Sequence, residues 1–248
     1  MLQYTVQRVL NAPGYDAPVI VANAQHRDML STQLTAIGVG DHKVILEPLA
    51  RNTAAAIALA AVASPSDQPL LVMPSDHVIQ NVVGFRSAVE SALPSVRNGL
   101  LVTFGITPQG PETGFGYIQQ GAVLETPVHK VQTFVEKPNV ETASAYLAEG
   151  GYLWNGGIFL FRAGDYVTAL SRYAPEVLDA ARKAVDDGTT AGIYFLPEPS
   201  AFGRSPSISV DYAVMEKADN VAVVPLDVGW SDVGSWDALY DHLPKDDQ

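Results

Sequence analysis

A strand, a helix and a second strand are predicted by residues 43–76, which read KVILEPLARNTAAAIALAAVASPSDQPLLVMPSD. The apolar runs at 43–46 and 70–73 have the length of buried strands, and the alanine-rich segment at 52–63 has the length of a helix. Consecutive elements of this kind form right-handed crossovers between parallel strands. Residues 43–76 therefore predict part of a parallel sheet covered by helices.

The same alternation extends along the chain on both sides of this unit. Further strands are expected at 19–22, 100–105, 116–120, 130–135 and 221–225, and further helices at 2–10, 25–36, 140–149, 164–185 and near 234–242. The alternating polarity of 116–120 and 130–135 is typical of antiparallel strands with one wet face. We therefore predict one α/β domain over 1–248, with a Rossmann-like, mixed and mainly parallel sheet flanked by helices.

Composition excludes several classes of function. The 248 residues carry 15 Lys and Arg against 27 Asp and Glu, a net charge of −12, which argues against nucleic acid as the main partner. No apolar run is long enough to span a bilayer and the first residues do not form a signal peptide, so we expect a cytoplasmic protein. The absence of cysteine excludes disulfides and Cys-ligated zinc, which favours carboxylate ligands and hard cations.

Two aspartates follow predicted strands, at the sheet edge where open α/β sheets bind their ligands. Asp76 comes just after the strand at 70–73, and Asp232 comes after the strand at 221–225. Two carboxylates with open coordination positions are a usual way to bind Mg²⁺ together with substrate phosphates. The alternative is that Asp76 is a helix N-cap or a turn residue, and that Asp232 caps the N-terminus of the last helix.

A second group of rim residues could recognise a phosphorylated sugar. Lys137 precedes Pro138, so we expect an extended backbone that projects its ammonium group towards phosphate, while Glu136 could accept hydrogens from sugar hydroxyls. The alternative for this pair is a surface ion pair. Gly116 could let a ligand approach the backbone and the Asn155 amide could bind hydroxyls, although glycine-rich segments also serve only as turns.

A third group lies around the start of the alanine-rich helix. Asn52 or Thr53 can cap this helix and leave its N–H groups available to an acceptor. Glu47 and the carbonyl of Pro48 are candidate acceptors for the N–H groups of guanine. Composition alone does not establish a guanine site.

Seven short motifs occur in order along nearly the whole chain, at 47–53 (EPLARNT), 73–77 (MPSDH), 113–118 (TGFGYI), 134–138 (FVEKP), 154–159 (WNGGIF), 209–213 (SVDYA) and 229–236 (GWSDVGSW). Together they resemble the mannose-1-phosphate guanylyltransferases, and they are closer to the bacterial GDP-mannose group than to nucleotidyltransferases that use UTP or dTTP. The resemblance implies a nucleotide-diphospho-sugar transferase fold. It also implies a reaction of GTP with mannose 1-phosphate that releases pyrophosphate and requires Mg²⁺.

The resemblance also implies a role for each candidate residue. Asp76 and Asp232 would hold the metal, and Lys137 would contact the sugar phosphate. The guanosine pocket would be lined by Glu47, Pro48, Asn52 and Thr53, and mannose would be contacted by Gly116, Glu136 and Asn155. The sugar phosphate would attack the α-phosphorus of GTP in line, so alignment and charge neutralisation would supply most of the catalysis.

One departure from the family pattern affects these expectations. Family members begin with a strand and a glycine-rich loop carrying an arginine, and the first residues of this sequence match the part that follows them. We therefore expect a first strand to be missing, leaving two neighbouring strands without a partner between them, and we expect no appended C-terminal domain. The alternatives are a related enzyme with another base or sugar, or a non-catalytic sugar-nucleotide-binding module. A homo-oligomer is compatible with the sequence.

Overall fold

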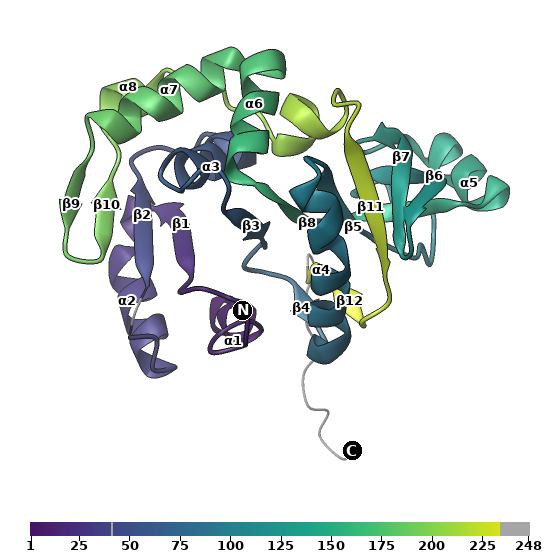
Figure 1. Cartoon of the computed structure of the whole chain (residues 1–248), viewed down its shortest axis with the longest axis horizontal. Helices are drawn as coiled ribbons and strands as arrows, with labels where there is room; N and C mark the ends of the chain where they lie inside the picture. Colours follow the sequence, from purple (N-terminus) through teal and green to yellow (C-terminus); the bar gives the residue numbers. More distant parts are fainter. Residues whose placement is uncertain (41, 234–248) are drawn as a thin grey trace.

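The computed structural model describes residues 1–40 and 42–233, in which helices pack around two main sheets (Figure 1). The larger sheet has the order β3 (Pro69–Val72), β8 (Tyr152–Arg162), β5 (Leu101–Ile106), β11 (Val221–Leu226), β7 (Val128–Val135), β6 (Tyr117–Glu125). The smaller sheet has the order β1 (Val19–Asn23), β2 (Lys43–Glu47), β10 (Tyr194–Leu196), β9 (Thr189–Ala191). A two-stranded ribbon joins β4 (Val78–Ile79) to β12 (Trp230–Ser231).

The predicted mixed α/β architecture is confirmed, but one additional strand changes the topology of the larger sheet. β8 was not predicted, yet it pairs antiparallel with both β3 and β5 and so separates two strands that run in the same direction. Parallel pairing in the described part of the chain is limited to β1 with β2, β2 with β10, and β5 with β11. The sheet is therefore mixed, with fewer parallel pairs than the strand–helix alternation predicted.

The helices occupy most of the predicted positions. They are α1 (Leu2–Gln7), α2 (Arg27–Ala36), α3 (Asn52–Val62), α4 (Val82–Arg97), α5 (Val140–Glu149), α6 (Ala163–Tyr173), α7 (Pro175–Asp186) and α8 (Pro199–Gly203), with short turns η1 (Ala24–His26) and η2 (Asp211–Met215). The helix predicted at 164–185 is interrupted at Ala174, because the following Pro175 disfavours helical backbone in the residue before it. The helix expected near 234–242 lies outside the described residues.

Strand β11 shows how the larger sheet is buried on both faces. Val221 and Val223 pack into the core shared with α3, α6 and α7, whereas Ala222 and Val224 pack into the core that contains α4. All four side chains are almost fully buried. Because alternate residues point to opposite faces, a continuous apolar run is what a strand covered on both sides requires.

The sheet is interrupted between β1 and β3, in agreement with the expected gap. Each is an edge strand of its own sheet, and Val21 of β1 and Val72 of β3 pack against the same core. Every residue of β3 is half-buried, and Val19 of β1 is 46% exposed. Interior strands of the larger sheet differ, since all six residues of β5 are buried.

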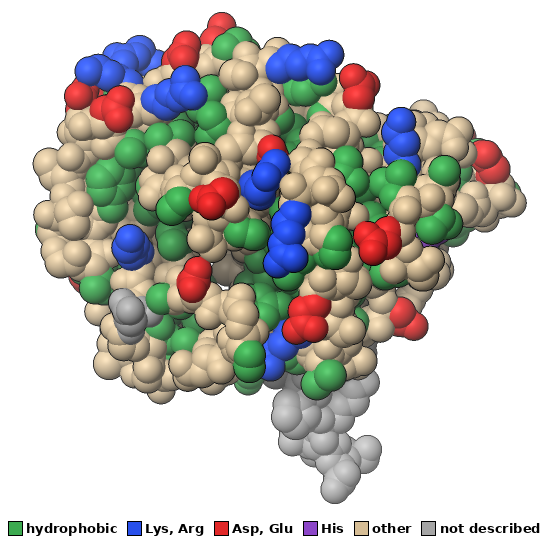
Figure 2. Space-filling model, viewed as in Figure 1, with side chains coloured by type: hydrophobic (Ala, Val, Ile, Leu, Met, Phe, Trp, Pro, Cys, Tyr) green, Lys and Arg blue, Asp and Glu red, His purple; other side chains and the backbone are tan. Residues whose placement is uncertain are grey.

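The described surface has mixed charges. On the face shown in Figure 2, acidic and basic side chains are interspersed, and the basic ones gather into no stripe among the described residues of that face. No helix in the described ranges has both the length and the apolar composition needed to cross a bilayer.

Candidate active site

A pocket of about 200 Å³ opens at the ends of strands from several parts of the chain. The predicted site residues that line it are Gly116, Glu136, Lys137, Asn155 and Asp232. Other lining residues were given no role from the sequence, including His77, Phe115, Gly157, Asp211 and Trp230. Most of these additional lining residues lie inside the seven motifs quoted above. Their position within a motif could therefore have identified them as site residues.

The ribbon of β4 and β12 places Asp232 beside His77, the residue that follows Asp76, whereas Asp76 itself is not among the described residues that line the pocket. Ser231 pairs with Val78 in an antiparallel register, so the residues that continue the two strands, Asp232 and His77, also come next to each other. Burial lowers the pKa of His77, and the negative charges of Asp76 and Asp232 oppose this effect. Both carboxylates are therefore close enough to act on one imidazole ring, although they lie far apart in the sequence.

The two aspartates have the chemistry that Mg²⁺ requires. The described residues contain no group of three or more His, Cys, Asp or Glu side chains that could form a complete metal cage. Mg²⁺ is usually bound by one or two carboxylates and retains positions for water and phosphate, so a two-carboxylate site fits this ion. Asp76 lies in a turn before β4, as the turn alternative predicted, and it caps no helix, because the next helix is capped by Asn81.

The backbone beside Asp232 is strained. Val233 has a φ of 47°, which is rare for a β-branched residue because its side chain clashes with the backbone in the left-handed region. Such conformations cost about 1 to 3 kcal/mol and occur most often at functional sites, where surrounding contacts hold them. The strain is consistent with a fixed position for the Asp232 carboxylate.

Helix α1 holds the loop that carries Asp76. Arg8 is buried and its Nη2 donates a hydrogen bond to the carbonyl of His77, while Thr5 Oγ1 lies 3.4 Å from the carbonyl of Ser75. The indole of Trp230 donates to His77 Nδ1 at 3.2 Å. Burial lowers the pKa of Arg8 to about 10. The imidazole and the loop backbone are thus held from both sides by side chains that the sequence did not indicate.

Lys137 occupies the pocket with a conformation opposite to the predicted one. Its φ is 49°, so the expected extended backbone before Pro138 is wrong. Its Nζ lies 3.8 Å from Glu136 Oε1, and its side chain is 59% exposed. The two residues thus form an ion pair, but the Glu136 side chain is only 10% exposed, so this is not the surface pair of the alternative, and an ion pair does not explain the strained backbone of Lys137.

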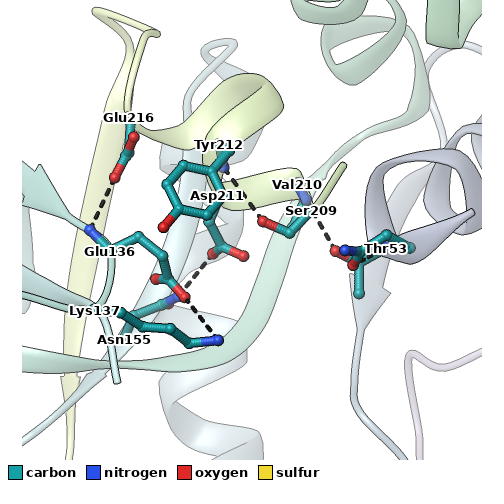
Figure 3. A network of polar contacts seen from close by, with 10 residues as sticks. Thr53, Glu136, Lys137, Asn155, Ser209, Val210, Asp211, Tyr212 and Glu216 are labelled. Atoms are coloured by element: carbon teal, nitrogen blue, oxygen red, sulfur yellow. Dashed lines mark hydrogen bonds and ion pairs between the residues drawn. The ribbon is translucent and has the colours of Figure 1, made fainter. Parts of the chain in front are cut away.

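Glu136 is a buried carboxylate whose second oxygen has no partner. Its side chain is 10% exposed, its backbone N–H donates to Glu216 Oε1 at 2.8 Å, and Oε2 makes no hydrogen bond (Figure 3). Burial and the negative charge of Asp211 raise the pKa of Glu136 to about 7, against the opposing charge of Lys137. An unpaired buried acceptor of this kind is costly unless a ligand donates to it.

Gly116 makes room for Glu136. A Cβ at residue 116 would overlap Glu136 Oε2 and would lie 3.2 Å from the Cβ of Asn155. Residue 116 itself is buried. The missing side chain therefore does not serve to let a ligand approach the backbone directly, as was predicted. Gly116 acts on the pocket through the position of the Glu136 carboxylate.

Replacing Gly116 with alanine is therefore expected to displace Glu136. We expect affinity for the sugar-containing ligand to fall about tenfold or more, with a loss of about 1 to 3 kcal/mol in the free energy of unfolding from overpacking. Gly110→Ala is the matched control, since a Cβ there meets no atom within 4 Å and residue 110 is not among the described residues that line the pocket. Ligand titration and urea unfolding of both variants test this, and equal behaviour of the two would contradict the role given to Gly116.

Asn155 lies inside a strand and not in a loop as predicted. It is a residue of β8, where the register with β5 shifts between Thr103 and Gly105. Asn155 Nδ2 donates to Asp211 Oδ1 at 2.8 Å, and Asn155 Oδ1 lies 3.0 Å from Thr103 Oγ1 (Figure 3 shows the bond to Asp211). The irregular pairing turns the amide into the pocket and the network fixes its orientation.

The four predicted nucleotide-binding residues do not line this pocket. Glu47 ends β2, Pro48 follows it, and Asn52 and Thr53 begin α3. Thr53 Oγ1 accepts a hydrogen bond from the backbone N–H of Val210 at 2.9 Å, which joins the start of α3 to the segment that carries Asp211 (Figure 3). The four predicted nucleotide-binding residues therefore lie on one side of the segment that carries Asp211, and the pocket lies on the other side.

The start of α3 is capped in part as predicted. Arg51 is at the N-cap position without a side-chain cap, but Asn52, which has a φ of 65°, accepts the backbone N–H of Thr53 on its Oδ1 at 2.8 Å. The N–H of Ala54 donates to the carbonyl of Ile208 at 3.2 Å, so these two N–H groups are not available to a ligand, contrary to the expectation. Burial raises the pKa of Glu47 to about 7, and its Oε1 has no hydrogen-bond partner. The unpaired Glu47 oxygen fits a ligand that offers N–H donors, as guanine does.

The raised pKa of Glu136 predicts a dependence of stability on pH. Its folded-state pKa of about 7 lies above the unfolded value near 4.5, so its stabilising contribution is complete below pH 4.5 and is lost as pH rises through 7. Glu136→Gln removes this titration. We expect the unfolding free energy of the variant relative to wild type to rise by about 1 to 2 kcal/mol between pH 5 and pH 8, after allowance for solvent screening.

Urea unfolding at the two pH values measures this difference. Glu112→Gln is the control, because Glu112 is exposed and outside the pocket. A constant difference between Glu136→Gln and wild type across this range would show that the carboxyl group is not protonated by burial.

The fold and the sequence are those of a transferase family. A family model described as nucleotidyl transferase matches residues 1–248, and the chain belongs to this family.

The chain is also similar over its length to individual curated proteins. It is 48% identical over 250 residues to the mannose-1-phosphate guanylyltransferase of Escherichia coli (strain K12), covering 97% of this chain and 52% of that protein. It is 47% identical over 251 residues to the xanthan biosynthesis protein XanB of Xanthomonas campestris pv. campestris (strain B100), covering 100% and 53%. The resemblance inferred from the motifs is thus confirmed, and the chain spans about half the length of the curated relatives it matches.

Solved structures agree with this family. A structure titled mannose-1-phosphate geranyltransferase, from Thermus thermophilus, aligns with a TM-score of 0.80 and 31% identity, covering 96% of this chain and 67% of that one. A structure titled mannose-6-phosphate isomerase, from Helicobacter pylori, aligns with a TM-score of 0.84 and 28% identity, covering 93% and 89%. A UDP-glucose pyrophosphorylase complex, at 15% identity and a TM-score of 0.62, shares the fold.

Proposed function

We propose that the chain forms the catalytic domain of a mannose-1-phosphate guanylyltransferase, which transfers GMP from GTP to mannose 1-phosphate and releases pyrophosphate and GDP-mannose. The observation that carries this proposal is the pocket that unites Lys137, Glu136, Asn155 and Asp232 from separate elements. Its cation suits a phosphate, its carboxylates and amide suit a polyol, and Asp76 lies close by.

In this mechanism an oxygen of the sugar phosphate attacks the α-phosphorus of GTP, a new P–O bond forms, and the bond to pyrophosphate breaks. Lys137 binds and orients the attacking phosphate, and the residues around Glu136 hold the hexose. Asp76 and Asp232 would hold Mg²⁺, which supplies positive charge to the phosphate oxygens. Glu47 and Asn52 would contact the guanosine. Because these substrates are intracellular metabolites, we place the reaction in the cytoplasm.

Binding and turnover measurements distinguish this function from its alternatives. The chain is titrated with GDP-mannose, GDP, UDP-glucose and dTDP-glucose, and pyrophosphate release is followed with GTP, UTP or dTTP and the matching sugar phosphate. We expect the guanine compounds to bind at least tenfold more tightly. Preference for UTP or dTTP would identify a related transferase, and GDP-mannose binding without turnover would identify a binding module.

A further inference from the structure

Asp211 is the pocket residue whose position suggests a role beyond those assigned above. It begins η2, is half-buried, and lines the pocket together with Glu136 and Asn155. Figure 3 shows that these three side chains converge from different elements, with Lys137 beside them. Burial raises the pKa of Asp211, as expected for a carboxyl group held away from bulk water.

The hydrogen bonds of Asn155 limit what its amide can offer a ligand. Its Oδ1 lies within hydrogen-bond distance of Thr103 Oγ1 at 3.0 Å and of the Gly157 N–H at 3.3 Å. The Gly157 N–H engages one lone pair of this oxygen, and the single hydrogen of the Thr103 hydroxyl is shared between the oxygen and the carbonyl of Ile158, which lies 3.2 Å away. One of the two Nδ2 hydrogens is donated to Asp211 Oδ1, so Asn155 retains one N–H donor for a ligand, while its oxygen is already approached by two protein donors.

The carboxylates are therefore the better-placed side-chain acceptors for the hydrogens of sugar hydroxyls. Besides the bond from Asn155, the carboxylate of Asp211 interacts with its own backbone N–H and with the Ser209 hydroxyl. A carboxylate has about four acceptor positions, so these three contacts leave capacity for a ligand. The unpaired Oε2 of Glu136, on a side chain that is only 10% exposed, is independent evidence that the pocket is built for a donor that the protein does not supply.

We propose that Asp211 is a sugar-recognition residue, which fixes the Asn155 amide with one carboxylate oxygen and accepts a hydrogen bond from a hexose hydroxyl with its remaining capacity. This inference rests on the proposed function. In this arrangement Asn155 and Lys137 donate hydrogen bonds to the sugar, whereas Asp211 and Glu136 accept hydrogen bonds from it. A hydroxyl group, which both donates and accepts, matches this pattern.

The test compares GDP-mannose with GDP, which share the nucleotide and differ by the sugar. Asp211→Asn must use its single amide oxygen to bind Asn155, and it then presents an NH₂ group where the hydroxyl needs an acceptor. Calorimetric titration of the 248-residue chain should show GDP-mannose affinity at least tenfold weaker than wild type, with GDP affinity changed less than twofold. Asp219→Asn, whose side chain is 86% exposed, removes a charge from the same segment and should match wild type.

The double variant Asn155→Asp with Asp211→Asn separates recognition from stability. It restores an amide–carboxylate hydrogen bond between the two positions, so its thermal midpoint should return towards wild type. Its GDP-mannose affinity should stay weak, because the acceptor has moved, and full recovery of affinity would overturn the proposal. Wild type that binds neither compound would refute the proposed function itself, whereas unchanged sugar preference in Asp211→Asn would refute only the role of Asp211.

Discussion

Replacing Asp76 or Asp232 by asparagine is expected to reduce Mg²⁺-dependent turnover about 10³-fold or more. Each change removes a negative charge that we propose to ligate Mg²⁺, from the residue next to His77 in the chain or from the residue that the ribbon of β4 and β12 places beside it. The loss corresponds to about 4 kcal/mol of transition-state stabilisation, which is the usual scale when a metal site is disrupted. Initial rates of pyrophosphate release, measured across a range of Mg²⁺ concentrations, give the effect directly.

The control for these variants is Asp227→Asn, because Asp227 is an exposed residue just after β11 and does not line the pocket. Its turnover should remain within twofold of wild type. Calorimetric titration of Mn²⁺ in the presence of GDP-mannose provides a readout that does not depend on turnover. Near wild-type rates at saturating Mg²⁺ in Asp76→Asn or Asp232→Asn would refute the metal assignment.

The second large effect is expected at Lys137. Lys137→Ala should raise the KM for mannose 1-phosphate about 100-fold and change the KM for GTP only a few-fold, because Lys137 lies beside Glu136 in the pocket that we propose binds the sugar. Lys137→Arg should recover only part of the loss, since a planar guanidinium does not replace a compact ammonium group at the same point. Steady-state titration of each substrate separates the two KM values.

Lys217→Ala is the matched control, because Lys217 is exposed and outside the pocket. It tests whether loss of any positive charge from this acidic protein weakens phosphate binding. An equal rise in both KM values for Lys137→Ala would place Lys137 away from the sugar phosphate. A rise of the same size in Lys217→Ala would indicate a general electrostatic effect.

Sequence patterns predicted helices and strands well where apolar residues recur at the regular spacing of a buried face. The run at 70–73 is the apolar part of β3, and the alanine-rich segment at 52–63 is α3. β8 was missed because Asn155, Gly156 and Gly157 read as a loop, whereas they lie within a long strand with an irregular register. A bulged strand loses the alternation by which strands are recognised.

The candidate site was predicted in part. The motifs indicated Glu136, Lys137, Asn155 and Asp232, and the pocket contains all four. The left-handed backbone of Lys137 was not foreseen, because it is imposed by neighbouring structure against the preference of a residue before proline.

The sequence by itself determined the α/β class, the acidic character, the family and five of the residues that line the pocket, because these depend on composition, periodicity and short motifs. Only the tertiary structure decided that β8 separates β3 from β5, that Gly116 accommodates Glu136, and that Asp211 orients Asn155. The physical reason is distance along the chain. Asn155 and Asp211 are 56 positions apart, and their hydrogen bond depends on how separate elements pack and not on any local pattern.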